Sequence, residues 1–293
     1  MTLAVSQPAG IPGDIVEALA LADRRARAAR RKRVLLGVVL PVLLLAVWQL
    51  SGRNGSLFGG ALPTPERAFH AWWDWAFAKP SPGLNPYLGT WFDTVVFSTI
   101  RVAKGFALAI LIGVPLGILV GWSRAAAATV DPTIQLLRPI PITAWLPITL
   151  AIFGIRDFGA VFLIMLGAFY PIVINTTQGA RDVEKTWIRA AQMMGASRLD
   201  VLIRVVLPAA LPSIFTGLRL GLGIAWTAVI VSEMVAVKSG LGYVMWDAYY
   251  VGRMDIVIAD MVSIGLLGYL SDRLIVLIET WALRWRRIQS FNG

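Results

Sequence analysis

The sequence predicts an all-α membrane protein with six transmembrane helices, and two of its features support this fold class. Of the 293 residues, 57% are hydrophobic and only 15% are charged, whereas a soluble domain has about 25% charged residues. Apolar runs long enough to cross ~30 Å of hydrocarbon at ~1.5 Å per residue recur along the chain. We expect transmembrane helices at 34–50, 94–122, 133–153, 158–178, 213–236 and 256–278.

Residues 1–33 are expected to form a basic cytoplasmic segment before the first transmembrane helix. The run "RRARAARRKR" at 24–33 is typical of a topology anchor on anionic lipid. A nucleic-acid-binding arm would need aromatic residues or a fold context that this segment lacks. We expect 34–50 to stay in the mature chain, because the preceding polar region is long and "QLSGRNG" is a poor cleavage site for a signal peptide.

Residues 51–93 are expected to form a periplasmic or extracellular loop. The loop is rich in proline and contains His70, the only histidine of the chain. Its segment "AFHAWWDWAF" carries Trp72, Trp73 and Trp75. Tryptophan is enriched where a membrane meets water, so an interfacial role is favoured over stacking on a ligand.

Residues 94–283 are expected to form the main membrane domain, with five transmembrane helices, followed by a cytoplasmic tail at 284–293. Most Arg and Lys residues outside the helices fall on alternate connections, together with the N-terminal segment and the tail. Positive charge is enriched on the cytoplasmic side of membrane proteins, so both termini and the long connection 179–212 are expected inside.

Glycines spaced four residues apart predict close helix packing. Gly113, Gly117 and Gly121 share one helix face, and Gly217 and Gly221 share another. Small residues on one face let neighbouring backbones approach closely. Such faces could pack within one protomer, or they could form a subunit interface or a moving contact in a gate.

The stretch "LLRPIPITAWLPITLAIF" indicates where a translocation path could lie. Its prolines at 139, 141 and 147 remove amide donors, and broken backbone at membrane depth is tolerated where it lines a wet cavity. Ionisable groups inside membrane helices are also functional candidates, although they could instead reach the interface. The candidates for the path are Arg138, Pro141, Trp145, Arg219, Trp226 and Glu233. We expect no acidic partner for Arg138 or Arg219 at the same depth.

The connection 179–212 is predicted to be a helix, a glycine and a second helix. Good helix formers fill 183–194, and Gly195 suits a left-handed helix stop. Ser197 and Asp200 have the spacing of a capping box, and proline at 208 is expected to end the second helix near 207. The apolar face of that helix is expected to consist of Leu199, Leu202, Ile203 and Val206. The narrow side of the first helix, at Ala190 and Ala191, would let a partner approach.

The chain offers no chemistry of its own. It has no cysteine and one histidine, which excludes thiolate metal sites and histidine clusters. No lysine follows a glycine as a phosphate-binding P-loop requires. We therefore expect no enzymatic activity and no cofactor in this chain. A transporter without a motor needs an ion gradient or a partner motor, and the helical connection favours a partner.

This connection resembles the coupling motif of ABC importer permeases, which reads Glu-Ala-Ala, three residues, Gly, nine residues and Ile-x-Leu-Pro. Ala190, Ala191, Gly195, Leu207 and Pro208 occupy matching positions, with valine at 205 for Ile and arginine at 189 for Glu. Over 60–287 the chain is similar to the nitrate, sulfonate, taurine and bicarbonate branch, through "LRPIPITAWLP", "RVVLPAALPSIFTGLRLGLGIAW" and "SGLGYVMWDAY".

The resemblance implies a type I ABC importer permease fold in a bacterial inner membrane. It further implies a second permease copy, two cytoplasmic ATPase subunits that bind ATP and Mg, and an external substrate-binding protein. The substrate would be a small anion such as nitrate, a sulfonate, taurine or bicarbonate. The residues implied in coupling to the ATPase are Arg189, Ala190, Ala191, Gly195, Ala196, Ser197, Leu207 and Pro208. The alternative is a secondary transporter or channel without an ATPase partner.

Overall fold

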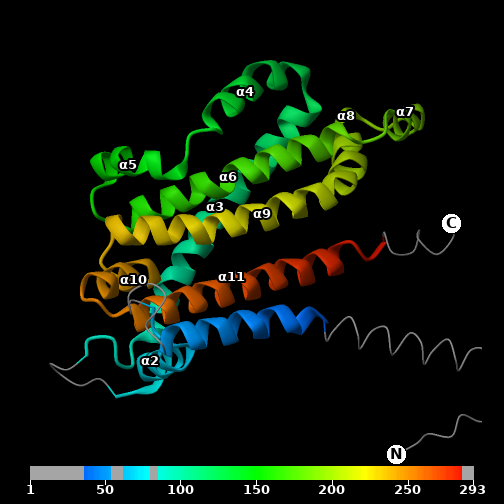
Figure 1. The fold of residues 1–293 in the computed structure, drawn as a ribbon. Coiled ribbons are helices and arrows are strands. Elements are labelled where there is room, and N and C mark those ends of the chain that lie inside the picture. Colours follow the sequence, from blue (N-terminus) through cyan, green and yellow to red (C-terminus); the bar gives the residue numbers. More distant parts are fainter. Residues whose placement is uncertain (1–35, 54–61, 80–84, 286–293) are drawn as a thin grey trace, which may run out of the picture. The chain divides into compact units, whose positions relative to one another are not determined.

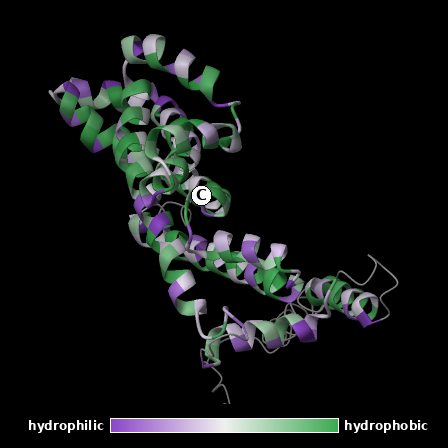
Figure 2. Ribbon diagram, turned by 90° about the vertical axis from the view of Figure 1, so that its left-hand side faces the viewer, coloured by the Kyte–Doolittle hydropathy of each residue, from purple (hydrophilic) through white to green (hydrophobic). Residues whose placement is uncertain are grey.

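The computed structural model describes residues 36–53, 62–79 and 85–285, and every regular element in these ranges is a helix. The chain divides into two compact units, Met1–Arg67 and Ala68–Gly293. The basic segment 1–33 and most of the tail 284–293 lie outside the described residues. Within them, five helices are long and apolar enough to cross a membrane, or six if one bent pair counts as a single span. Apolar residues predominate along these helices (Figure 2).

The first unit contains the helix Leu36–Arg53, which confirms the first expected span and extends it by three residues at its end. Its apolar side chains are mostly exposed, as a lipid-facing helix requires. Trp48 Nε1 donates a hydrogen bond to the carbonyl oxygen of Pro63 at 2.9 Å. This bond ties the end of the helix to the segment that follows it.

The expected connection 51–93 contains a helix, α2 (Pro65–Phe77), which includes His70. Proline suits the first position of a helix, where no intrahelical donor is needed. Trp75 is fully buried, and its Nε1 donates to Thr90 Oγ1 at 3.2 Å. Trp73 is exposed. The tryptophan segment therefore has one structural anchor and an exposed face.

The core of the second unit is a bundle in which α6 (Asp157–Arg181) packs between α3 (Trp91–Trp122) and α9 (Leu207–Ala236). Figure 1 shows the three helices running together, with α11 (Met254–Ala282) beside α9. These helices confirm four expected spans, at 94–122, 158–178, 213–236 and 256–278, with ends that differ by a few residues.

The spaced glycines bring α3 and α9 against α6 within one chain. A Cβ atom built on Gly117 would lie 2.6 Å from Thr176 Cβ, and one on Gly121 would lie 2.5 Å from Ala180 Cβ. A Cβ on Gly221 would lie 3.0 Å from the carbonyl oxygen of Ala168. Only a residue without a side chain fits these contacts, so both glycine faces serve packing within the protomer.

The span expected at 133–153 is broken, as its prolines indicated. The chain forms α4 (Arg124–Leu137), the short 3₁₀ helix η2 (Ile142–Trp145) and α5 (Leu146–Phe153), and the pair bends by 93°. Proline at 141 has an extended conformation with ψ 145°, and the residue before a proline is also driven out of the helical region. The connection between the expected spans 94–122 and 133–153 is also helical, and Ser123 Oγ caps α4 by accepting from the Ala126 amide.

The helix after Gly195 does not end at Pro208. Following α7 (Lys185–Met193), α8 (Arg198–Val201) continues through the π turn η3 (Leu202–Val206) into α9. The amide of Leu207 donates to the carbonyl of Leu202, five residues earlier. A π turn widens the helix locally, and Pro208, which has no amide to donate, follows it as the second residue of α9. The segment Arg198–Ala236 is thus one helical body.

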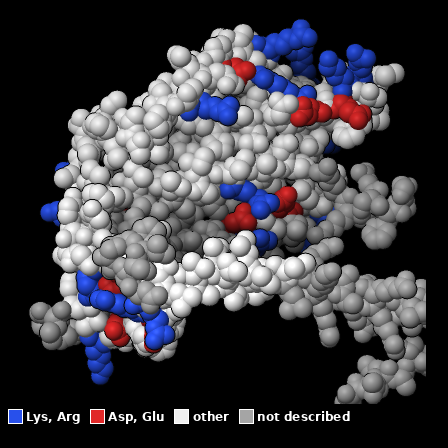
Figure 3. Space-filling view, viewed as in Figure 1, with Lys and Arg blue, Asp and Glu red and all other residues white. Residues whose placement is uncertain are grey.

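The two ends of the bundle differ. Figure 1 shows α7 and α8 at one end of α6 and α9, and α5 and α10 (Leu241–Tyr250) at the other. Charged side chains of both signs gather over the end where α7 and α8 lie (Figure 3). At the opposite end, Tyr87 donates to Asp247 Oδ2 at 2.7 Å. Burial and this hydrogen bond raise the pKa of Tyr87 above its usual range, so the phenol remains a donor at neutral pH.

Candidate translocation path and docking segment

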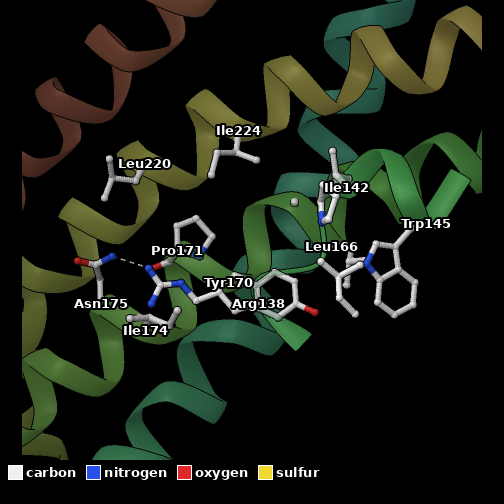
Figure 4. Close-up of a pocket in the computed structure, with 13 residues that line it drawn as sticks. Arg138, Ile142, Trp145, Leu166, Tyr170, Pro171, Ile174, Asn175, Leu220 and Ile224 are labelled. Carbon is white, nitrogen blue, oxygen red and sulfur yellow. Dashed lines mark hydrogen bonds between the residues drawn. The ribbon is translucent and has the colours of Figure 1, made fainter. Parts of the chain in front are cut away.

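A cavity of about 480 Å³ lies where the backbone breaks between α4 and α5. The break supplies one wall, α6 supplies a second, and α9 closes a third (Figure 4). The lining residues that we use below are Arg138, Ile142, Trp145, Tyr170, Ile174 and Asn175. The prolines that end the helix therefore create the space, as broken backbone at membrane depth predicts.

The cavity has few polar groups. Arg138 caps the C-terminal end of α4 and is the one charged residue in the lining formed by the described residues. The Tyr170 hydroxyl and the Asn175 amide come from α6, and Asn175 Nδ2 donates to the carbonyl oxygen of Pro171 at 2.8 Å. Trp145 Nε1 is buried and has no hydrogen-bond partner among the described residues. The cavity thus presents positive charge and donors against apolar walls.

The structure brings three of the six path candidates together at this cavity, namely Arg138, Pro141 and Trp145. Arg219 does not line this cavity. Its Nε donates to Asp272 Oδ1 at 2.9 Å, and this ion pair joins α9 to α11. The expectation that Arg219 lacks an acidic partner is therefore wrong. The partners are 53 residues apart, so no helical spacing could reveal them.

Trp226 and Glu233 also lie in contacts between helices. Trp226 is buried, and its Nε1 donates to Ser271 Oγ at 2.9 Å. Glu233 is fully buried and accepts hydrogen bonds from Ser98 Oγ and the Gly242 amide. Both residues therefore have hydrogen-bond partners within the protomer.

Sequence reasoning missed the buried arginine that neutralises Glu233. Arg101 on α3 lies 2.7 Å from Glu233 and 2.7 Å from Asp157, and it also donates to the carbonyl oxygen of Ser239 at 2.8 Å. The signal was an arginine inside one apolar run and a glutamate inside another, since buried charges are found paired. This network joins α3, α6, α9 and the turn before α10.

The local geometry of the docking segment matches its prediction. Gly195 has φ +86°, and Ser197 and Asp200 form the expected capping box. Met193 and Met194 at the tip are 88% and 82% exposed. Two large apolar side chains thus project beside the left-handed glycine.

The predicted apolar face of the second helix is partly wrong. Leu199 and Ile203 are exposed, whereas Val201 and Val206 are fully buried. The π turn adds a residue to the local period, which places side chains five residues apart on one face. Ala191 is also buried, so it packs within this chain.

The motif residues are distributed over both faces of this segment. Arg189, Ala190, Gly195 and Ser197 are exposed. The half-buried members are Ala196, Leu207 and Pro208. The exposed part therefore lies at α7 and the glycine, and the half-buried part continues into the membrane helix.

Apolar helices packed through glycines, a cavity at a broken helix and an exposed helical tip define a multi-pass membrane transport protein. Residues 113–284 match the family described as binding-protein-dependent transport system inner membrane component. The chain belongs to this family, and it is the permease subunit of an ABC importer.

Named relatives are similar over most of the chain. The bicarbonate transport system permease protein CmpB of Synechococcus elongatus is 36% identical over 85% of this chain and 90% of CmpB. The nitrate import permease protein NrtB of Synechocystis sp. is 36% identical over 85% of this chain and 89% of NrtB. The putative aliphatic sulfonates transport permease protein SsuC of Bacillus subtilis is 32% identical over 96% of this chain and 98% of SsuC.

A solved structure supports the fold. A chain of the MetNI methionine ABC transporter in an inward-facing conformation superimposes with a TM-score of 0.61 at 21% identity, covering 68% of this chain and 99% of that chain. The type I importer permease fold is thereby confirmed.

Proposed function

We propose that this permease imports a small anion, and that a partner ATPase drives it through the tip formed by α7, Gly195 and α8. The observation that carries the proposal is the unbroken helical body Arg198–Ala236. Its first turn is α8, which is part of the exposed tip, and Leu220 and Ile224 further along it line the cavity. A movement of the tip is transmitted along this body to the cavity wall.

The exposed tip has the chemistry of a docking surface. Met193, Met194 and Leu199 are exposed apolar side chains, and methionine adapts readily to an apolar groove. Arg189 and Arg198 flank them and favour an acidic rim on the partner. We assign this surface to a groove on the ATPase, which would bind ATP and Mg.

The helical segment that connects the tip to the cavity is short and is packed at its start. Leu220 lies thirteen positions after Leu207, which is ~20 Å of α-helix. The buried residues Val201 and Val206 hold the start of this helix against the C-terminal end of α6 and the connection after it, through Ala180 and Val183. Closure of two ATPase subunits would therefore move α9 relative to its neighbours.

The assembly we propose is a permease homodimer with two ATPase subunits and an external binding protein. The family is described as binding-protein-dependent, which supports an external binding protein. A dimer has two docking tips, and one ATPase subunit on each tip gives two ATPase subunits. Exposed apolar side chains such as Leu111 and Met261 suit lipid or a second permease copy. We propose that the chain is oriented in the membrane with the tip and both termini in the cytoplasm.

The anion assignment has two supports. Three similar permeases are named for bicarbonate, nitrate and aliphatic sulfonates. The cavity has Arg138 and, among its described lining residues, no carboxylate, whereas a cation path would carry acidic groups.

Uptake by the purified permease, ATPase and binding protein in liposomes tests this function. We expect ATP-dependent uptake of labelled nitrate, bicarbonate or an alkanesulfonate, and no uptake of a neutral sugar or a cationic amine, because Arg138 favours negative charge. Omitting the ATPase should abolish uptake. Uptake of the sugar or the amine alone, or uptake without ATPase, would contradict the proposal.

Single cysteines test the orientation, since the native chain has none. Lys79→Cys should react with a membrane-impermeant thiol reagent added to intact cells, and Gln192→Cys should react only after the cells are opened. Both positions are exposed, so each is accessible from its own side. The reverse labelling pattern would overturn the proposed orientation.

A further inference from the structure

Arg138 differs from the arginines on the neighbouring helices. The arginines on α3, α6 and α9 each have a carboxylate, in the pairs Arg101–Glu233, Arg181–Asp131 and Arg219–Asp272. Arg138 makes no ion pair with any residue in the described part of the chain. Its guanidinium is therefore a cation at the cavity without a counter-ion in the described ranges.

The remaining cavity wall is largely apolar. The aliphatic lining residues are Ile140, Ile142, Leu166, Ile174, Leu220 and Ile224. Trp145 and Tyr170 add aromatic rings, and the volume of about 480 Å³ lies within the range typical of sites for small organic ligands. Such a wall can contact the hydrocarbon part of a ligand. It has few polar groups to replace the water that a ligand loses on binding.

Figure 4 shows the Arg138 side chain extending across the α6 wall toward Asn175, with Ile174 and Tyr170 next to it. The hydrogen bond from Asn175 Nδ2 to the carbonyl oxygen of Pro171 holds the Asn175 amide in place. A planar guanidinium fits two oxygens of an oxyanion at once. Charge thus lies at one side of the cavity, and hydrocarbon lies over the rest.

We propose that the cavity is a transit binding site for an alkanesulfonate, with the sulfonate on Arg138 and the alkyl chain along the apolar wall. The proposal rests on the proposed import of an anion. Nitrate and bicarbonate have no apolar part to bury, so the wall gives them no compensation for lost water. Taurine carries an ammonium group, and the described lining has no carboxylate to receive it.

Charged thiol reagents test the site directly, because Ile174→Cys places a single thiol in the lining of a chain without cysteine. In the permease–ATPase complex in nanodiscs, we compare its reaction rates with sulfonatoethyl and trimethylammonioethyl methanethiosulfonate. Arg138→Gln should lower the ratio of anionic to cationic rates about tenfold, and Arg138→Lys should retain it, since the charge is what attracts the sulfonate. Thr129→Cys, exposed on α4, is the matched control whose ratio should not change.

Protection of the same thiol tests the ligand class. Pentanesulfonate should slow the modification of Ile174→Cys at concentrations where taurine and nitrate do not, and Arg138→Gln should remove the protection. An unchanged rate ratio in Arg138→Gln, or equal protection by nitrate and taurine, would overturn the site. If ATP-driven anion uptake persists in that case, the proposed function stands and the binding site alone fails.

Discussion

Arg101→Gln is expected to lower the free energy of unfolding by about 3–5 kcal/mol, because it leaves a buried carboxylate without its counter-ion. The side chain of Arg101 is 6% exposed and that of Glu233 is not exposed at all. Their 2.7 Å contact is the centre of a network that also holds Asp157 and Ser239. Unfolding in mixed detergent, followed by tryptophan fluorescence, measures the change.

An exposed ion pair, in contrast to the buried one, supplies the control. Arg204 lies 3.6 Å from Asp200, one helical turn away, with side chains that are 80% and 44% exposed. Arg204→Gln should cost at most about 1 kcal/mol, since solvent screens exposed pairs. Adding Glu233→Gln to Arg101→Gln should recover part of the loss, because the uncompensated charge is then gone. If Arg101→Gln costs no more than Arg204→Gln, the network does not have the stabilising role that we assign to it.

The same network explains the turn before α10. Gly240 has φ +103°, and a Cβ atom at this position would overlap the carboxylate of Glu233. The neighbouring amides of Leu241 and Gly242 donate to Ser98 and Glu233 at 2.8 and 3.0 Å. The buried carboxylate therefore fixes the path of the turn, and the turn in return satisfies the carboxylate.

Local signals were sufficient for much of the fold. Segment length and apolar composition predict α3, α6, α9 and α11, because a bilayer sets the length that a helix needs. The stop at Gly195 and the capping box at Ser197 depend on neighbouring residues alone, and both are confirmed. The glycine spacing predicted close packing but could not choose between a contact inside the protomer and one between subunits.

Features that depend on distant partners could not be predicted. Arg101 and Glu233 are 132 residues apart in the chain, and no periodicity relates them. Prolines in 133–153 indicated a break, but the 93° bend depends on how the two halves pack on their neighbours. The π turn at Leu202–Val206 follows from keeping Val201 and Val206 buried together, which only the packed structure reveals.

Gly195→Val should reduce ATP-driven uptake about tenfold or more while leaving the membrane helices folded. An L-residue in the left-handed region costs ~1–2 kcal/mol, and a β-branched one is a particular misfit. The φ of Gly195 is +86°, and no atom within 4 Å would obstruct a Cβ atom there. The strain is therefore in the backbone of the tip, and relieving it changes the angle between α7 and α8 without disturbing the core.

Other substitutions at Gly195 distinguish an effect of backbone conformation from an effect of side-chain size. Gly195→Asn should retain more uptake than Gly195→Val, because asparagine tolerates positive φ. Arg189→Glu, at an exposed position of α7, should leave uptake near normal, since it restores the residue of the coupling motif and keeps the helix. Uptake in liposomes and copurification of the ATPase are measured together for each variant. Loss of uptake or of the ATPase in Gly195→Val supports a tip whose left-handed turn transmits force, whereas normal uptake with a normal complex would show that another surface couples the ATPase to α9.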